Sequence, residues 1–136
     1  MYSLRRTKDV GLVRSLHEKL FEGDEWVGDD HTFWVLRDSE GLPVGFCSAI
    51  HRPQLGYVYL SRAGVDESAR GAGLQRRMIR ARVQWAKRLG AREVITYTLL
   101  RNYDSFVNLL KCGFKFYKPD TAYVGEQVHY MRLTLA

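Results

Sequence analysis

Two glycines, Gly71 and Gly73, lie between a predicted strand at residues 57–65 and a predicted helix at residues 74–89. Because glycine has no Cβ, the backbone can turn tightly at these positions and come close to a ligand. The first N–H groups of the following helix, with the positive end of its dipole, form a natural phosphate site. No acidic residue occurs in the loop or in the helix. We therefore predict that residues 70–75, called the phosphate loop below, bind a pyrophosphate.

The length of 136 residues suits one domain, predicted to span residues 1–136. The composition, 46% hydrophobic and 26% charged, is that of a soluble globule, and no leader or membrane-spanning run is evident. Cys47 and Cys112 are too few for a disulfide framework and lack the spacing of a metal site. We expect a cytoplasmic protein, a monomer or homodimer, without a metal.

The net charge of +6 favours anionic partners: nucleic acid, a membrane surface or a phosphorylated cofactor. Eight Arg and Lys residues lie between Arg70 and Arg92, whereas five acidic residues crowd into residues 22–30. The basic helix could meet nucleic-acid phosphates, but no aromatic residues alternate with its charges to stack on bases. Nucleic acid is therefore the weaker interpretation, and no membrane partner is expected.

Hydrophobic periodicity and turn residues predict the order of the elements. A first strand is followed by a helix capped by Thr7, and the acidic residues 22–30 form a loop, with or without a short helix. On the basic helix the predicted apolar stripe is Leu74, Met78, Ala81, Trp85 and Leu89. The other expected strands are residues 32–37, 44–51, 57–65, 93–100, 114–118 and 128–135, and a last helix is expected at residues 102–112.

This order predicts a mixed α/β fold, with a mostly antiparallel sheet of six to seven strands and helices on both faces. One parallel crossover runs from strand 57–65 through the basic helix to strand 93–100. Ligands of such sheets bind at the carboxyl ends of the strands, beside a helix N-terminus. The phosphate loop occupies that position.

Two common phosphate motifs do not fit the loop. A Walker motif requires Gly-Lys-Ser/Thr, but Gly73 is followed by Leu74 and Gln75. A dinucleotide fingerprint requires three spaced glycines early in the chain and an acid about 20 residues later, whereas this pair lies in mid-chain. Nucleotide hydrolysis and dinucleotide binding are therefore disfavoured.

The sequence resembles the Gcn5-related N-acetyltransferase (GNAT) superfamily. The family signature, Arg/Gln-x-x-Gly-x-Gly/Ala after a strand ending in Val, is similar to Val65 with residues 70–75, although Gln75 departs from its final small residue. A second block, Asn followed by Gly-Phe, is matched by Asn102 and residues 113–114. The resemblance covers nearly the whole chain and implies a GNAT-like acyl-CoA N-acyltransferase fold.

The resemblance also implies an acetyl-CoA site. The backbone of the phosphate loop would hold the pyrophosphate, and the strand end and one asparagine would contact the pantetheine arm. The implied cofactor residues are Ala63, Gly64, Val65, Arg70, Gly71, Ala72, Gly73, Leu74, Gln75 and Asn102.

The implied chemistry is direct attack by an amine on the thioester. It needs a base and an N–H donor for the oxyanion. The backbone N–H of Ala63 is the candidate donor, and Tyr59, or a water bound to it, is the candidate base; His51, Glu25 and Asp30 are further possibilities. Leu109 stands where the family often has a Tyr that protonates the leaving thiolate.

Two functions remain open on the sequence. The first is acetyl transfer to a primary amine of a small molecule or protein, with residues 22–30 attracting a cationic acceptor. The alternative is a non-catalytic GNAT-fold protein, serving as an acyl-CoA sensor or as a structural or interaction module, which Leu109 and the missing acidic base favour.

Overall fold

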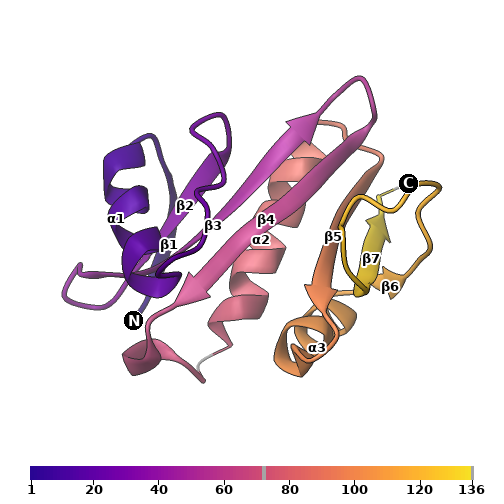
Figure 1. The fold of residues 1–136 in the computed structure, drawn as a ribbon. Helices are drawn as coiled ribbons and strands as arrows, with labels where there is room; N and C mark the ends of the chain where they lie inside the picture. Colours follow the sequence, from indigo (N-terminus) through magenta and orange to yellow (C-terminus); the bar gives the residue numbers. More distant parts are fainter. Residues whose placement is uncertain (72, 136) are drawn as a thin grey trace. The chain divides into compact units, whose positions relative to one another are not determined.

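The computed structural model describes residues 1–71 and 73–135 and contains a seven-stranded sheet (Figure 1). The hydrogen-bonding order of the strands is β1-β2-β3-β4-β5-β7-β6. The pairs β1–β2, β2–β3, β5–β7 and β6–β7 are antiparallel, and β4–β5 is parallel. The strands are β1 (Ser3–Thr7), β2 (Thr32–Arg37), β3 (Pro43–Arg52), β4 (Tyr57–Val65), β5 (Glu93–Leu99), β6 (Lys115–Phe116) and β7 (Val128–Thr134). The predicted mixed, mostly antiparallel α/β fold is confirmed.

The helices are α1 (Val10–Leu20), η1 (Glu67–Ala69), α2 (Leu74–Arg88) and α3 (Tyr103–Lys111). By its internal contacts the chain divides into two compact units, residues 1–50 with 61–78 and residues 51–60 with 79–136. The prediction of a single domain stays a prediction. None of the helices in the described part of the chain has the length and apolar character needed to span a bilayer.

In the first unit, α1 packs on β2 (Figure 1). Helical spacing places Val13 and Leu16 on one face of α1, where they meet Phe33, Val35 and Phe46 in a buried cluster. The helix is capped by Asp9, whose carboxylate accepts from the N–H of Leu12 at 3.1 Å. The prediction of Thr7 as the cap is wrong, because its hydroxyl accepts from the N–H of Asp9 instead.

In the second unit, β5 is the central strand. It pairs with β4 through residues 57–59 and with β7 along its whole length. Side chains from these strands and from the segment after α3 are fully or almost fully buried, and they form the core: Val58, Leu60, Val94, Phe114 and Met131.

The apolar stripe predicted on α2 needs correction. Leu89 lies beyond the end of the helix and is 41% exposed, whereas Ile79 and Val83 are buried. Arg82, in the middle of the helix, is only 3% exposed. Because pattern analysis assigns arginine to the solvent face, it could not place this residue. The strand predicted at 114–118 is limited to Lys115–Phe116.

Candidate functional site

The segment that leads from β4 into the phosphate loop is anchored by Asp66. Its backbone N–H donates to the carbonyl of Val44 at 2.7 Å, and its carboxylate accepts from the N–H and the hydroxyl of Ser68. These hydrogen bonds lower the pKa of Asp66. Lys19 of α1 forms an ion pair with the same carboxylate at 3.7 Å. Asp66 is therefore held in place through both its backbone N–H and its carboxylate.

The loop itself turns at two glycines with left-handed backbone, Gly71 (φ 90°) and Gly73 (φ 70°). Among the described residues, a Cβ built on Gly71 would have no atom within 4 Å, and one built on Gly73 would have only the Arg76 guanidinium, at 3.8 Å. The backbone is thus open on the side where a side chain would lie. Ala72, predicted to bind the cofactor, lies outside the described residues.

Helix α2 starts immediately after these glycines. Its first backbone hydrogen bond runs from the N–H of Arg77 to the carbonyl of Gly73, at 3.2 Å. The N–H groups of Leu74, Gln75 and Arg76 precede that bond, so the helix supplies no carbonyl for them. The first turn contains no acidic residue. These features are compatible with the anion site that the sequence predicts, which stays a prediction.

Three arginines surround the loop, and two of them are partly occupied by the protein itself. The Nε of Arg70 donates to the carbonyl of Val65 at 3.1 Å, and Nη1 of Arg77 donates to the carbonyl of Tyr2 at 2.8 Å. Arg76 has no hydrogen bond or ion pair among the described residues and lies beside Gly73. Its guanidinium is the cation best placed to meet a phosphate at the loop.

The end of β4 is packed closely against the loop that follows α1. Gly64 is contacted by the ring of Phe21, because a Cβ there would lie 2.6 Å from Cε2 of that ring. The guanidinium of Arg62 lies over the same ring, 5.0 Å from its centroid. Arg62 also forms an ion pair with Asp24 at 3.2 Å. The loop after α1 is thereby fixed to the strand that carries Ala63, Gly64 and Val65.

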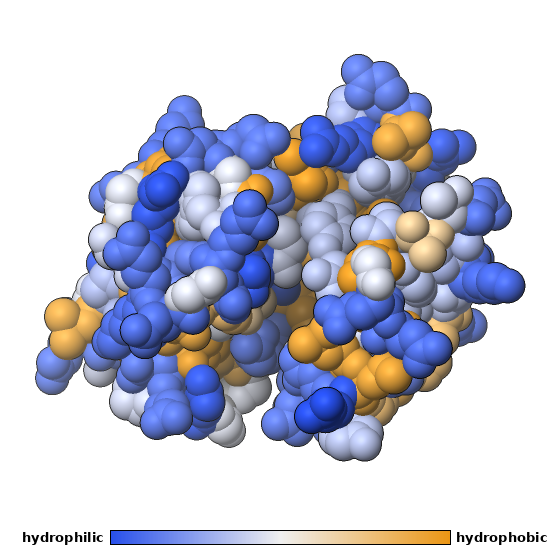
Figure 2. All heavy atoms as spheres, viewed as in Figure 1, coloured by the Kyte–Doolittle hydropathy of each residue, from blue (hydrophilic) through white to orange (hydrophobic). Residues whose placement is uncertain are grey.

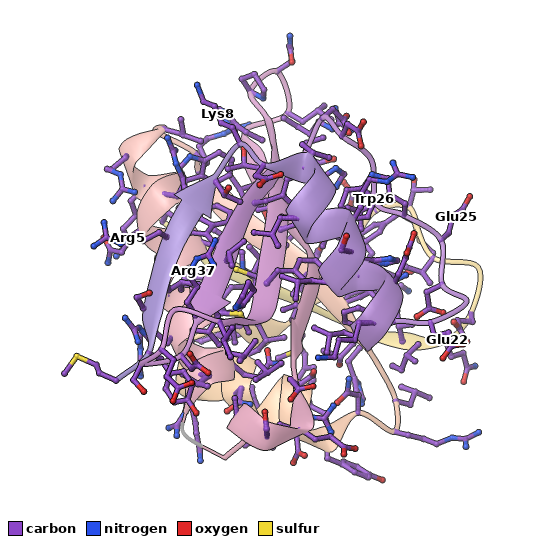
Figure 3. The ribbon with its side chains drawn as sticks, turned by 90° about the vertical axis from the view of Figure 1, so that its left-hand side faces the viewer. Arg5, Lys8, Glu22, Glu25, Trp26 and Arg37 are labelled. Carbon is purple, nitrogen blue, oxygen red and sulfur yellow. The ribbon has the colours of Figure 1, made fainter. Side chains whose placement is uncertain are left out.

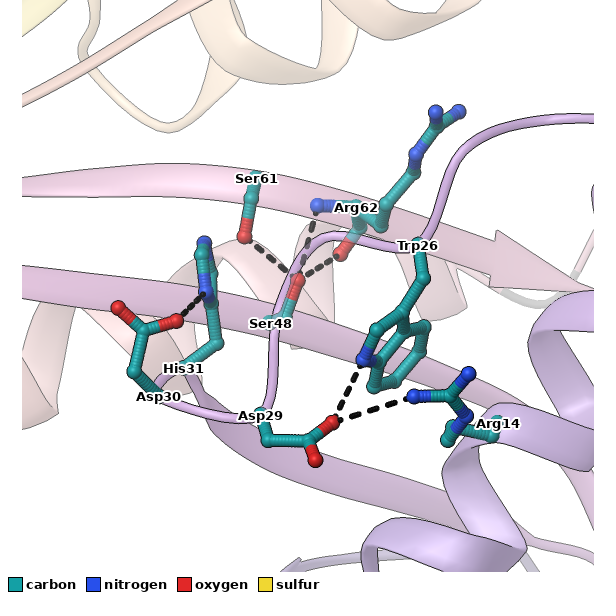
Figure 4. Close-up of polar contacts among 8 residues, drawn as sticks. All are labelled: Arg14, Trp26, Asp29, Asp30, His31, Ser48, Ser61 and Arg62. Atoms are coloured by element: carbon teal, nitrogen blue, oxygen red, sulfur yellow. Dashed lines mark hydrogen bonds and ion pairs between the residues drawn. The ribbon is translucent and has the colours of Figure 1, made fainter.

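The acidic segment of residues 22–30 contains no helix, and most of its carboxylates have partners. Besides the Asp24–Arg62 pair, Asp29 accepts from the indole N–H of Trp26 at 2.7 Å and pairs with Arg14 (Figure 4). Asp30 lies 3.2 Å from Nδ1 of His31. Glu22 and Glu25 are exposed and have no partner among the described residues (Figure 3). The free negative charge of the segment is therefore smaller than its sequence indicates.

His17, on the buried face of α1, is a feature that the sequence did not single out. It is 3% exposed, its ring stacks on Phe21 at 5.5 Å and meets Trp26 edge-on at 5.3 Å. Its Nε2 atom is buried and has no hydrogen-bond partner in the described part of the chain. Burial, and to a smaller extent the positive charge of Arg62, lowers the pKa of His17 and so favours its neutral ring. Its position on the buried face of α1 follows from helical spacing, but no sequence signal indicates the unpaired nitrogen.

In the second unit, Tyr59 belongs to a cluster of tyrosines. Its ring stacks on Tyr97 at 6.5 Å and meets Tyr123 edge-on at 6.2 Å. The Tyr123 hydroxyl donates to the carbonyl of Thr96 at 3.3 Å and lies 3.2 Å from the hydroxyl of Tyr117. Burial raises the pKa of both Tyr117 and Tyr123, so these phenols stay protonated.

Two of the other predicted residues of the second unit, Asn102 and Leu109, belong to α3 and its cap. Asn102 caps this helix, with its side-chain oxygen accepting from the N–H of Ser105 at 3.3 Å. Leu109 is buried on the inner face, at 5% exposed. His51 meets the ring of Trp85 edge-on. Tyr103, Val107 and Leu110 of α3 are exposed, beside the exposed Asp104 and Lys111, and Figure 2 shows hydrophobic surface in this region.

A glycine turn between a buried strand and the N-terminus of a helix is an arrangement typical of anion sites in α/β domains. The family assignment is more specific. The model of the acetyltransferase (GNAT) family matches residues 2–114, and the chain therefore belongs to that family. The protein is an acetyl-CoA-dependent N-acetyltransferase whose acceptor is unidentified.

Solved structures agree on the fold. An IAA acetyltransferase from Bacillus cereus ATCC 14579 is 15% identical, with a TM-score of 0.83 over 99% of this chain and 100% of its own. The ribosomal-protein-S18-alanine N-acetyltransferase from Escherichia coli is 15% identical, with a TM-score of 0.78 over 100% and 95% of the two chains. A putative streptothricin acetyltransferase from Bacillus anthracis str. Ames, in complex with acetyl coenzyme A, is 21% identical, with a TM-score of 0.68 over 83% and 70%. No curated protein matches the chain by sequence.

Proposed function

We propose that the protein transfers the acetyl group of acetyl-CoA to a primary amine by direct attack of the amine on the thioester. The observation that carries this proposal is the phosphate loop. Its two left-handed glycines leave the backbone open among the described residues, and the N–H groups of Leu74, Gln75 and Arg76 precede the first helical hydrogen bond of α2. Together with the backbone of Arg70 and the Arg76 guanidinium, they would hold the pyrophosphate.

The end of β4 supplies the next part of the site. The backbone of Ala63, Gly64 and Val65 would pair with the pantetheine arm, and the Ala63 N–H would donate to the oxyanion of the tetrahedral intermediate. Asn102 is a further candidate for the arm. Its side-chain oxygen is used to cap α3, which leaves its NH₂ group to donate.

Proton transfer is the least equipped part of the site. Leu109 carries no proton, so the CoA thiol leaves without an acid from that position; with a pKa of about 8.5 for a free thiol, the thiolate is a fair leaving group. We assign the removal of the amine proton to a water held at Tyr59.

The acceptor that fits the first unit best is a cationic amine, such as a polyamine, a lysine side chain or a protein N-terminus. Glu22 and Glu25 support this choice, since they are exposed carboxylates that have no partner within residues 1–71 and 73–135. Both cysteines are free, which supports a place in the reducing cytoplasm.

The test is an acetyl-transfer assay on the intact chain with acetyl-CoA and a panel of amines: a polyamine, a lysine peptide, peptides with free N-termini and an aminoglycoside-like amine. Release of the CoA thiol is followed with a thiol reagent, and the acetylated product is identified by mass. We expect amine-dependent thiol release for at least one cationic amine. Binding of acetyl-CoA without thiol release from any amine would instead support the non-catalytic sensor.

A further inference from the structure

Ser48, a fully buried residue of β3, makes an unusual contact with the backbone of β4 (Figure 4). Its hydroxyl accepts from the N–H of Arg62 at 2.9 Å and lies 3.4 Å from the carbonyl oxygen of the same residue. It is also 2.6 Å from the hydroxyl of Ser61. A side chain therefore meets the peptide groups that, in a regular ladder, the backbone of the neighbouring strand would meet.

The direction of the peptide groups changes along β4 at this point. The carbonyl of Leu60 accepts from Oγ1 of Thr96 in β5, at 2.8 Å. Two residues later, Arg62 is bonded to β3 instead, through Ser48. In a regular strand, residues two apart direct their N–H and C=O groups to the same edge. The difference between Leu60 and Arg62 therefore indicates one extra residue, a β-bulge, at Ser61.

Beyond the bulge the alternation is regular again. Asp66, four residues after Arg62, also bonds to β3, through the carbonyl of Val44. Ala63 and Val65 consequently direct their peptide groups away from β3. For Val65 this is visible directly, because its carbonyl accepts from Nε of Arg70 rather than from β3. The bulge thus decides to which edge of β4 the N–H of Ala63 is presented.

We propose that Ser48 is a positioning residue for acetyl transfer. By holding both peptide groups of Arg62, its hydroxyl fixes the bulge and so aims the N–H of Ala63 at the thioester oxygen. This role rests on the proposed function, in which that N–H stabilises the oxyanion. Ser48 itself touches neither substrate, and its effect passes entirely through the backbone of Arg62 and Ala63.

The test compares Ser48→Ala with Ser61→Ala. Removing the Ser48 hydroxyl frees the buried Arg62 N–H, and we expect kcat to fall about 10- to 100-fold, as for a misplaced catalytic group. The Kd for free CoA, which has no thioester oxygen, should change less than threefold. Ser61→Ala is the matched control, because it removes one hydroxyl from the same cluster but leaves the bonds between Ser48 and Arg62. Its kcat should stay within threefold of the wild type.

Ser48→Cys keeps the volume with a weaker donor and acceptor, so the role remains testable if Ser48→Ala does not fold; we expect an intermediate kcat. An active wild type with an equally active, folded Ser48→Ala or Ser48→Cys would overturn the positioning role alone. Equal losses of kcat and CoA affinity would also overturn it, since they would indicate a general structural effect. If the wild type transfers acetyl to no amine, the proposed function fails and this role fails with it.

Discussion

Gly45 of β3 offers a quantitative test of the close packing between β3 and the end of β4. A Cβ built on Gly45 would lie 2.6 Å from the carbonyl oxygen of Gly64 and 3.3 Å from Cα of Val65. Both are backbone atoms, so no flexible side chain can move aside, and the strands must separate locally. For Gly45→Ala we expect the free energy of unfolding to fall by about 1–3 kcal/mol, the usual cost of overpacking a core.

The measurement is urea unfolding followed by tryptophan fluorescence and circular dichroism, with acetyl transfer measured on the same preparation. Because the displaced atoms belong to the strand end that would hold the pantetheine arm, kcat/KM for acetyl-CoA should also fall. Gly11→Ala is the matched control, since its Cβ would make only an ordinary contact, 3.6 Å from Oδ1 of Asp9, inside α1. It should stabilise the protein by about 0.5 kcal/mol. A Gly45→Ala protein as stable as Gly11→Ala would refute the reasoning.

Three further predictions concern single features of the site. Burial lowers the pKa of His17 in the native state, so below about pH 6.5 the unfolded chain binds a proton at this residue more readily than the native state does. The free energy of unfolding should therefore fall by up to about 1.4 kcal/mol per pH unit as the pH decreases. His17→Phe should remove this loss in urea titrations at pH 5 and 7. The double change Glu22→Gln with Glu25→Gln should raise KM for a cationic amine about threefold or more at low salt. Glu40→Gln, in the hairpin turn, should leave KM unchanged. An unchanged KM in the double variant would exclude Glu22 and Glu25 from acceptor binding. Tyr59→Phe should lower kcat about tenfold if its hydroxyl holds the proton-accepting water, and a kcat within twofold of the wild type would leave Tyr59 a packing residue.

Local features of the chain were predictable because local chemistry determines them. The turn between β2 and β3 contains residues typical of turns: the N–H of Asp38 donates to the carbonyl of Leu42 at 2.9 Å, and Gly41 has left-handed backbone. The glycines of the phosphate loop have positive φ for the same reason. The buried residues of α1, Val13, Leu16 and His17, likewise follow helical spacing.

The parts that were missed depend on residues far apart in the sequence. The bulge at Ser61 is held by Ser48, 13 residues earlier, and nothing in the alternation of β4 indicates it. The pairing of Asp24 with Arg62 joins positions 38 residues apart, so the free charge of the acidic segment could not be read from its composition. Arg82 is buried although its side chain is charged, which a hydrophobic pattern cannot represent.

The central claim, that residues 70–75 bind the pyrophosphate of acetyl-CoA, is tested most directly by calorimetric titration of three proteins with acetyl-CoA. The wild type should bind. Gly73→Asp should show no binding, because its carboxylate would occupy the space beside the loop backbone and repel phosphate. The positive φ at this position would also strain any residue other than glycine. Gly41→Asp carries the same change at φ 83° in an open turn of the first unit and should bind like the wild type. A wild type that does not bind, or a folded Gly73→Asp that binds as tightly as the wild type, would contradict the account.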